Sequence, residues 1–315
     1  MRRPLMLSSW VAVLALAVVF VLLNSGLDTD YIIPKRLLRL AAIGLGGVCI
    51  AFSAIVFQSI AGNRILTPAI MGYESVYLLF QALLVWLLGT SSLMLMGQNG
   101  NFFASVLLML AYSWVIHRWL FRDGRSNVYF LLLLGLVLTM VISTLTQFIQ
   151  VTVSPGEFAV LQGYNEASFN RVRPGQLGYA AVLVLLVAGV MLRSRALLDV
   201  IALGREQALS LGVDYPRCVR QQLFLVAVLV AISTSLVGPT AFMGIFVANL
   251  AYALAGTTRH RATLPMASAV AVGLFILAQL LVEQVLNYRT TVTILINLIC
   301  GGYFLALMIR TRGRA

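Results

Sequence analysis

Charged residues are scarce in this chain, and their scarcity excludes most classes of soluble protein. Only 10% of the 315 residues are Asp, Glu, Lys or Arg, whereas 61% are hydrophobic. A soluble domain carries charge on about a quarter of its residues. The apolar runs are mostly about 16 to 25 residues long, which is the length that a helix needs to cross about 30 Å of hydrocarbon. The sequence therefore predicts an all-α, polytopic membrane protein.

Residues that commonly perform chemistry are also few. The single lysine, Lys35, is not preceded by a glycine-rich turn, which excludes a Walker A phosphate loop. No nucleophile and base stand in a recognisable arrangement, so the chain is not expected to be an enzyme. The cysteines and histidines lack disulfide or metal-ligand spacing: Cys49, Cys218, Cys300, His117 and His260. We expect no metal site and no directly bound cofactor, and we expect both histidines to lie in loops near lipid headgroups.

Breaks in the apolar pattern predict ten membrane-spanning helices. They are Met6–Asn24, Leu37–Ala61, Ala69–Gly89, Phe102–Trp119, Tyr129–Phe148, Leu177–Leu192, Leu223–Leu236, Pro239–Ala255, Leu264–Leu286 and Val292–Ile309. The first resembles a signal peptide, but its length and the lack of a cleavage site favour a retained helix. The seventh and eighth are short and joined by Gly238-Pro239, which leaves a tight turn or a broken helix as alternatives to two full crossings. Residues 1–315 are expected to form a single membrane domain.

The distribution of basic residues predicts the orientation. If both termini are cytoplasmic, 16 basic residues lie in cytoplasmic segments and six lie outside, as the positive-inside rule requires. Topology therefore accounts for the net charge of +12, and nucleic-acid binding is not expected. The six exceptions are Lys35, Arg36, Arg39, Arg171, Arg173 and Arg289.

A polar island, residues 193–222, interrupts the apolar pattern. It contains five arginines, each of which would cost about 2.5 to 3.5 kcal/mol at the centre of a bilayer, so the island lies outside the membrane. Glu206 suits the first turn of a short helix and Gly212 its end, whereas Asp214 and Pro216 suit the start of a second helix. The apolar Ala208, Leu209 and Leu211 between the charges favour a docking surface over a solvated connector.

Polar side chains within the predicted spans are candidates for a substrate pathway, with hydrogen bonding between helices as the alternative. Gln279 and Glu283 are four residues apart and share a helical face. Glu74 lies near the predicted cytoplasmic end of its helix and is expected to reach water. The amides that we retain as pathway candidates are Gln58, Gln147 and Asn297.

Four segments of the chain resemble the FecCD family of BtuC-like permeases, which belong to ABC importers for iron–siderophore complexes, haem and vitamin B12. They are 203–213 in the island, 36–39 before the second helix, 63–72 before the third and 238–244 around the eighth. The resemblance covers nearly the whole chain and implies the type II ABC importer permease fold. It also implies alternating access in the bacterial inner membrane, among lipids, with ATP hydrolysed by separate cytoplasmic ATPase subunits.

The resemblance also implies roles for individual residues. Coupling to the ATPase would fall to Gly204, Arg205, Glu206, Ala208, Leu211 and Gly212. Docking of a periplasmic or lipid-anchored siderophore-binding protein would fall to Arg36, Arg39 and Arg289. Ser126 and Asn127 would lie near the cytoplasmic gate.

Two departures from the family pattern narrow the expected branch. After Gly244 the family usually has a Pro-His pair and then an arginine, whereas this chain has Ala248, Asn249 and Tyr252. Residues 63–68 also replace the commoner Asn-Pro-Leu form. Both variants resemble a branch that imports ferric siderophores through two different permease chains, so we expect a heterodimer, with a homodimer as the alternative.

Other substrates and another transporter class stay open at this point. Haem or a cobalamin could replace the siderophore within the family. An ion-coupled secondary transporter would need buried ionisable groups near the middle of the membrane, of which the sequence offers at most Glu283.

Overall fold

A computed structural model describes residues 3–24, 26, 28–120, 128–240 and 242–312, and within these ranges the secondary structure is helical throughout, which confirms the all-α class. The helices are α1 (Arg3–Leu22), α2 (Ile32–Ala61), η1 (Pro68–Met71), α3 (Tyr73–Leu88), α4 (Ser91–Leu120), α5 (Val128–Thr152), α6 (Pro155–Tyr164), η2 (Phe169–Arg171), α7 (Pro174–Arg193), α8 (Arg195–Ile201), α9 (Arg205–Ser210), α10 (Tyr215–Leu236), α11 (Met243–Ala255), α12 (His260–Leu280), the π-helical turn η3 (Leu281–Val285) and α13 (Val292–Arg312).

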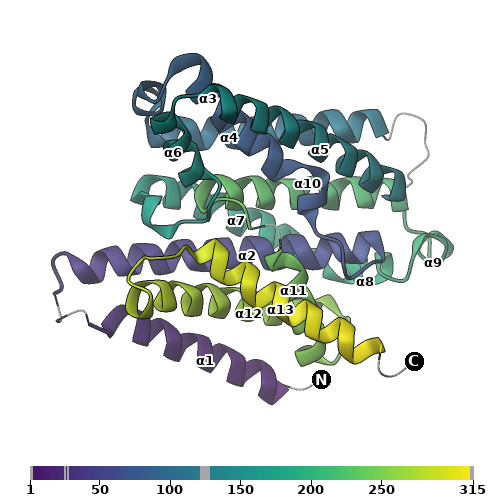
Figure 1. Cartoon of the computed structure of the whole chain (residues 1–315). Helices are drawn as coiled ribbons and strands as arrows, with labels where there is room; N and C mark the ends of the chain where they lie inside the picture. The colour runs from purple at the N-terminus through teal and green to yellow at the C-terminus, as the bar shows by residue number, and fades with distance from the viewer. Residues whose placement is uncertain (1–2, 25, 27, 121–127, 241, 313–315) are drawn as a thin grey trace.

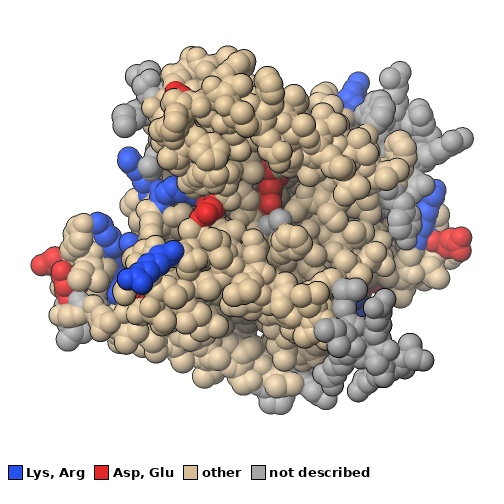
Figure 2. Space-filling model, viewed as in Figure 1, with Lys and Arg blue, Asp and Glu red and all other residues tan. Residues whose placement is uncertain are grey.

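The predicted spans correspond to α1, α2, α3, α4, α5, α7, α10, α11, α12 and α13. In the described part of the chain, seven of these are long and apolar enough to cross a membrane, and the three shorter ones, α3, α11 and α13, are apolar as well. Figure 1 shows both termini at the same end of the molecule as α8 and α9, as an even number of crossings requires. We call this end the knob end and the opposite end the rim end. Most Lys and Arg side chains visible in Figure 2 lie toward these two ends, and the surface between them is largely uncharged.

The centre of the bundle is built from α2, α10 and α12. The apolar windows of these helices are 72%, 72% and 67% buried, against 11% for α1 and 22% for α5, which therefore lie at the periphery. Gly47 brings α2 close to α12, because a Cβ added there would lie 2.7 Å from Cγ2 of Val272 and 3.0 Å from its backbone nitrogen. Small residues allow such close backbone packing between membrane helices.

A second layer, α3 to α6, packs across α10 from the layer that contains α2, α12 and α13 (Figure 1). The short η1 is clamped within it, because a Cβ on Gly135 of α5 would lie 2.9 Å from the Cα of Met71. The hydroxyl of Tyr112 on α4 donates to the Met71 carbonyl at 2.9 Å. The segment before α3, which carries the predicted family motif, is thus held between α4 and α5.

The structure adds detail to the predicted elements in three places. The short α6 was not expected, although Ser154 and Glu157 form a capping box whose Ser-x-x-Glu pattern is visible in the sequence. The second helix that Asp214 and Pro216 predict in the island is continuous with the seventh span, and the two form α10. Around Gly238, whose φ is +111°, α10 and α11 are separate helices, and α11, with 13 residues, is shorter than a full crossing requires.

Candidate functional sites

The knob, which we define as residues 195–213, is a pair of short helices with a well-defined end. Gly204, with φ of +106°, precedes α9, and Glu206 lies in its first turn as expected. At its end Gly212, with φ of +79°, donates to the carbonyl of Leu209 at 2.9 Å, and Val213 donates to that of Ala208 at 3.0 Å. These two bonds form a Schellman motif, which satisfies carbonyls that the end of the helix would leave unpaired.

The surface of the knob is apolar at three exposed leucines. Leu203, Leu209 and Leu211 are 58%, 47% and 62% exposed, and Arg205 and Glu206 next to them also face outwards. Ala208, by contrast, is fully buried. Its side chain packs beneath the knob and cannot itself enter a partner's cleft as expected, so Leu203 and Leu209 join Leu211 as the contact candidates.

A partly buried hydrogen-bonded chain ties the knob to two central helices. One carboxylate oxygen of Asp199 on α8 accepts the backbone N–H of His260 at 2.8 Å and lies 2.6 Å from Nδ1 of the same residue. On the other side of the ring, Nε2 of His260 lies 2.9 Å from the hydroxyl of Ser59 on α2. These contacts connect α8 to the start of α12 and the end of α2.

Neither histidine lies in a loop near lipid, so that expectation is wrong. His260 is fully buried and His117 is 7% exposed, with Nδ1 of His117 3.2 Å from the hydroxyl of Ser113. His117 bonds within α4, and His260 bonds to residues of α8 and α2, so both serve the fold rather than a lipid surface.

The segment after α2 is held by two amides. Gln58 donates to the carbonyl of Arg64 at 2.9 Å, and Asn249 of α11 donates to the same carbonyl at 3.0 Å. The guanidinium carbon of Arg64 lies 4.8 Å from the centre of the Tyr252 ring. Gln58 is buried in this contact, so its side chain stabilises the segment and does not line an open pathway. Asn249 and Tyr252, where the chain departs from the family pattern, thus have a shared structural role.

Two of the expected docking arginines, Arg36 and Arg39, form hydrogen bonds within the chain. Arg36 is buried, and its guanidinium donates to the carbonyls of Phe20 at 3.0 Å, Val21 at 3.3 Å and Leu23. It therefore satisfies the end of α1, where a cation also suits the helix dipole. The docking role expected for Arg36 is incompatible with this position.

Arg39 is also paired, with Glu283. The distance between Nη1 of Arg39 and Oε1 of Glu283 is 2.8 Å, and Gln279 donates to the same oxygen at 2.6 Å. The expectation that Gln279 and Glu283 share a face is confirmed by this contact. Exposed cations at the rim end include Lys35, Arg173 and Arg289.

Glu74 is half-buried and is held by a backbone contact. Its carboxylate accepts the backbone N–H of Thr240 at 3.0 Å, and both residues line a small cavity beside α2, α3 and α10. Glu74 thus holds the connection between α10 and α11.

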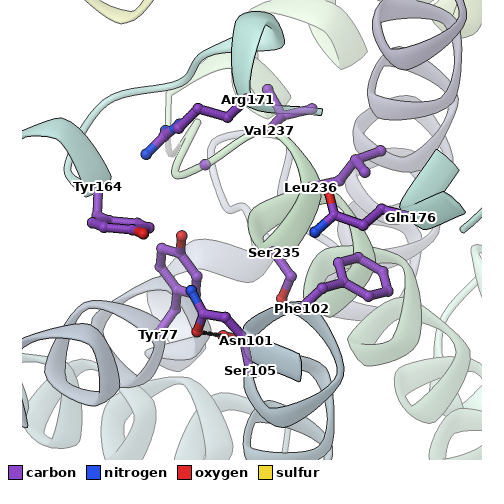
Figure 3. Close-up of a pocket in the computed structure, with 11 residues that line it drawn as sticks. Tyr77, Asn101, Phe102, Ser105, Tyr164, Arg171, Gln176, Ser235, Leu236 and Val237 are labelled. Carbon is purple, nitrogen blue, oxygen red and sulfur yellow. Dashed lines mark hydrogen bonds between the residues drawn. The ribbon is translucent and has the colours of Figure 1, made fainter. Parts of the chain in front are cut away.

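A polar vestibule opens where η2 passes the rim-side end of α10 (Figure 3). It consists of two adjoining cavities, of about 50 and about 400 Å³, which share Tyr164 and Arg171. Arg171 donates to the main-chain carbonyl of Glu166 at 2.6 Å, and its guanidinium carbon lies 5.1 Å from the centre of the Tyr164 ring. The polar groups of the smaller cavity come from Tyr77, Asn101, Ser105, Gln176 and Ser235.

The remaining pathway candidates divide into two groups. Gln147 on α5 and Asn297 on α13 are exposed, among apolar side chains that are exposed too. Ser126 and Asn127 lie outside the described residues. Among the residues that were searched for metal ligands, no group of three His, Cys, Asp or Glu side chains could hold an ion.

A family model described as the FecCD transport family matches residues 5–310, nearly the full length of the chain. The chain is a member of the FecCD family. It is 40% identical over 281 residues to the petrobactin import system permease protein YclO of Bacillus subtilis, with 89% of each chain covered. It is 32% identical to the petrobactin permease protein FatC of Bacillus anthracis, covering 89% of this chain and 79% of that one.

A solved structure supports the family assignment at the level of the fold. It is described as an inward-facing conformation of a metal-chelate type ABC transporter, and it superposes on this chain with a TM-score of 0.85 at 20% identity. The match covers 97% of this FecCD chain and 98% of the other. The expected type II permease fold is confirmed.

Two features of this FecCD chain were not found from the sequence. Asp199 and His260 are 61 residues apart, and nothing in the local pattern pairs them. Arg171 was noted only as a basic residue that the positive-inside rule did not explain, and its neighbours in the vestibule come from helices far apart in the chain.

Proposed function

We propose that this chain is the transmembrane permease subunit of an ABC importer that carries a ferric siderophore across the bacterial inner membrane. The observation that carries the proposal is the 40% identity to a petrobactin import permease along 89% of both chains. More distant relatives include a ferric enterobactin permease and an iron(3+)-hydroxamate permease, both of Escherichia coli. Three kinds of iron chelate thus recur among proteins similar to this one.

Uptake by whole cells tests the proposal. Cells that lack this gene, with and without a plasmid copy, are given radio-iron as ferric petrobactin, ferric enterobactin or a ferric hydroxamate, with and without ATP depletion. We expect uptake of one chelate that requires both the gene and ATP. Uptake that survives ATP depletion but requires the proton gradient would instead support a secondary transporter. Gene-dependent uptake of cobalamin alone would support a cobalamin importer, which is the function that the name of another relative gives.

The importer is proposed to contain a second, related permease chain. Two petrobactin permease proteins occur in each Bacillus species: this chain is 40% identical to YclO but 21% to YclN, and 32% to FatC but 24% to FatD. It therefore matches one kind in each species better than the other. Co-purification of the tagged chain with its neighbour-encoded permease would support a heterodimer, whereas a complex with two copies of this chain would contradict it.

The knob is proposed to receive the cytoplasmic ATPase. Three exposed leucines project from a short helix pair whose backbone is fixed by the Schellman motif, and a rigid apolar surface of this kind suits docking. When the ATPase moves the knob, the hydrogen bonds between Asp199, His260 and Ser59 transmit that movement to α12 and α2. Replacement of Leu209 and Leu211 by Asp should abolish co-purification of the ATPase, whereas replacement of both by Met, which keeps apolar side chains of similar size, is the matched control and should retain it.

Of the expected docking residues Arg289 is retained, and Lys35 is proposed to join it in place of Arg36 and Arg39 in docking the binding protein. They are exposed at the rim end, and exposed charges of one sign steer the encounter with an acidic partner. The double change Lys35→Glu and Arg289→Glu should slow association of the binding protein at low salt. An association rate equal to that of the wild type would remove both residues from the interface.

The knob end is proposed to be cytoplasmic. Single cysteines introduced at Glu206 and at Asp30 would be labelled in intact cells with a reagent that does not cross membranes. Labelling at Asp30 alone supports the proposed orientation, and labelling at Glu206 alone reverses it.

A further inference from the structure

The smaller cavity of the vestibule has a positive charge with no carboxylate in its described lining, whereas the larger cavity is lined by Glu166 as well as by Arg171. Among the described residues that line the smaller cavity, Arg171 is the single charged side chain. Its guanidinium donates to a main-chain carbonyl, that of Glu166, and forms no ion pair with a carboxylate in the described part of the chain. Arg39 at the same end is paired with Glu283, so an unpaired arginine is not general there.

Internal contacts fix the position of the Arg171 guanidinium and bond only one of its donor hydrogens to the described residues. The Glu166 carbonyl fixes one of its five donor hydrogens, and the Tyr164 ring lies 5.1 Å from its central carbon. Figure 3 shows the Tyr164 and Tyr77 rings on the side of the vestibule toward which Arg171 extends, with the Tyr77 hydroxyl directed into the space. The site therefore offers a fixed cation beside two phenol rings.

Several other groups of the vestibule can donate hydrogen bonds. The amide of Asn101 is oriented by Gln81, with bonds of 3.0 and 3.2 Å in the two directions. The hydroxyl of Ser235 in the smaller cavity and that of Thr291 in the larger one are buried and have no hydrogen-bond partner within the described residues. Buried polar groups are normally satisfied, so two unsatisfied hydroxyls in one vestibule indicate a ligand or water there.

We propose that the vestibule binds anionic oxygen atoms, carboxylate or phenolate, on the surface of an iron(III) chelate. This inference rests on the function proposed above. Hard metal ions are held by anionic oxygen ligands, and a chelate that supplies more than three negative charges to Fe³⁺ is itself an anion. Arg171 keeps its charge at any physiological pH and presents parallel N–H donors to such oxygens. The larger cavity, at about 400 Å³, falls within the range of small-molecule sites.

The geometry also suits release of the chelate. One cation with neutral donors around it, and with Glu166 at the edge of the larger cavity, binds an anion less tightly than a cluster of cations does, and a transport site must let its substrate leave. The iron itself needs no ligand from the protein, since the chelate supplies all of them. Arg171 therefore selects the charge of the chelate and does not touch the metal.

Direct binding to the assembled transporter tests the proposal without the binding protein. The permease pair with its ATPase is placed in lipid nanodiscs, and the dissociation constant is measured for two probes, the anionic ferric petrobactin and a net-neutral ferric trihydroxamate. Arg171→Gln should weaken binding of the anionic probe about tenfold, which corresponds to about 1.4 kcal/mol. Arg171→Lys should weaken it less, and the neutral probe should be unaffected. The control is Arg173→Gln, an exposed arginine two residues away, which should change neither value by more than about twofold.

The outcomes separate this inference from the proposed function. Unchanged affinity of Arg171→Gln for the anionic probe overturns the assignment, and an equal loss for both probes shows a structural role rather than recognition of charge. If cellular uptake of an iron chelate requires the gene but the Arg171 variants bind it normally, only the vestibule proposal fails. If no iron chelate is taken up or bound by the wild type, the proposed function fails first. Misfolding is detected by loss of the ATPase from the complex, and Arg171→Lys keeps the charge should Arg171→Gln not assemble.

Discussion

The charged side chains at the rim end are mostly bonded within the chain, whereas those of the knob point outwards. At the rim end Arg36 is bonded to carbonyls of α1 and Arg39 to Glu283. At the knob, Arg205 and Glu206 are exposed and form no ion pair among the described residues. Arg36 and Arg39 therefore stabilise the bundle, and Arg205 and Glu206 are available to a partner.

The largest expected effect is the loss of the internal bonds of Arg36. Arg36→Met keeps much of the apolar stem but leaves three carbonyls at the end of α1 without their donor, so we expect a loss of about 2 to 3 kcal/mol in the free energy of unfolding. Lys35→Met, one residue earlier and exposed, should stay within about 0.5 kcal/mol. The measurement is the midpoint of detergent-induced unfolding of the purified complex. Among the described residues the Lys35 side chain contacts only the exposed Tyr31 of its own first helical turn, so equal effects of the two variants would contradict the contrast between a buried and an exposed cation.

The next effect concerns Asp199, a carboxylate of the knob that is bonded within the chain. Asp199→Ala removes the acceptor for two N–H groups of His260, and we expect a loss of about 1 to 2 kcal/mol in stability. We also expect more ATP to be hydrolysed per chelate transported, because α8 is no longer tied to α12. Asp199→Asn keeps an acceptor oxygen and should restore part of the coupling.

The control for this carboxylate is Asp30→Asn at the rim end, where Asp30 is exposed. It should leave both stability and the ratio of ATP to transport unchanged. If Asp199→Ala lowers stability and leaves that ratio as in the wild type, the residue belongs to the fold alone.

Sequence patterns predicted what depends on local order. The ten spans follow from hydrophobic length, and the end of α9 follows from Gly212, whose φ of +79° favours glycine. The partners of Arg36 could not be predicted in this way, because the local sequence is the same whether an arginine bonds to the end of α1 or contacts another protein. The vestibule could not be predicted either, since Tyr77, Tyr164 and Arg171 meet only when η2 packs against α10. Contacts between distant segments are decided by packing, which one sequence does not display.

A glycine at each end sharpens the comparison further. Gly212 in the knob and Gly26 at the rim end have φ of +79° and +58°, and a Cβ added at either would meet nothing within 4 Å. Gly212→Ala and Gly26→Ala should therefore each cost about 1 kcal/mol, from backbone strain alone. The two variants should differ in function, because the knob alone is proposed to meet the ATPase. Measured ATPase stimulation should fall for Gly212→Ala only, and an equal fall for both would mean that stability, rather than docking, controls the activity.

The smallest expected effect is the pH dependence of the exposed capping box that begins α6. The hydroxyl and the backbone N–H of Ser154 donate to Glu157 at 2.8 and 3.0 Å, and these bonds lower the pKa of the Glu157 carboxyl below its ordinary value of 4.5. Because the folded-state pKa is the lower one, the bonds contribute stability above about pH 4.5 and that contribution is lost as the pH falls through the folded-state pKa. Thermal unfolding of the wild type should therefore shift to slightly lower temperature between pH 6 and pH 3 relative to Glu157→Gln, which cannot titrate. Parallel curves for the two proteins would mean that the capping box contributes no charge-dependent stability. Charges at the rim end would then stabilise the fold only where they are buried, as at Arg36 and Glu283.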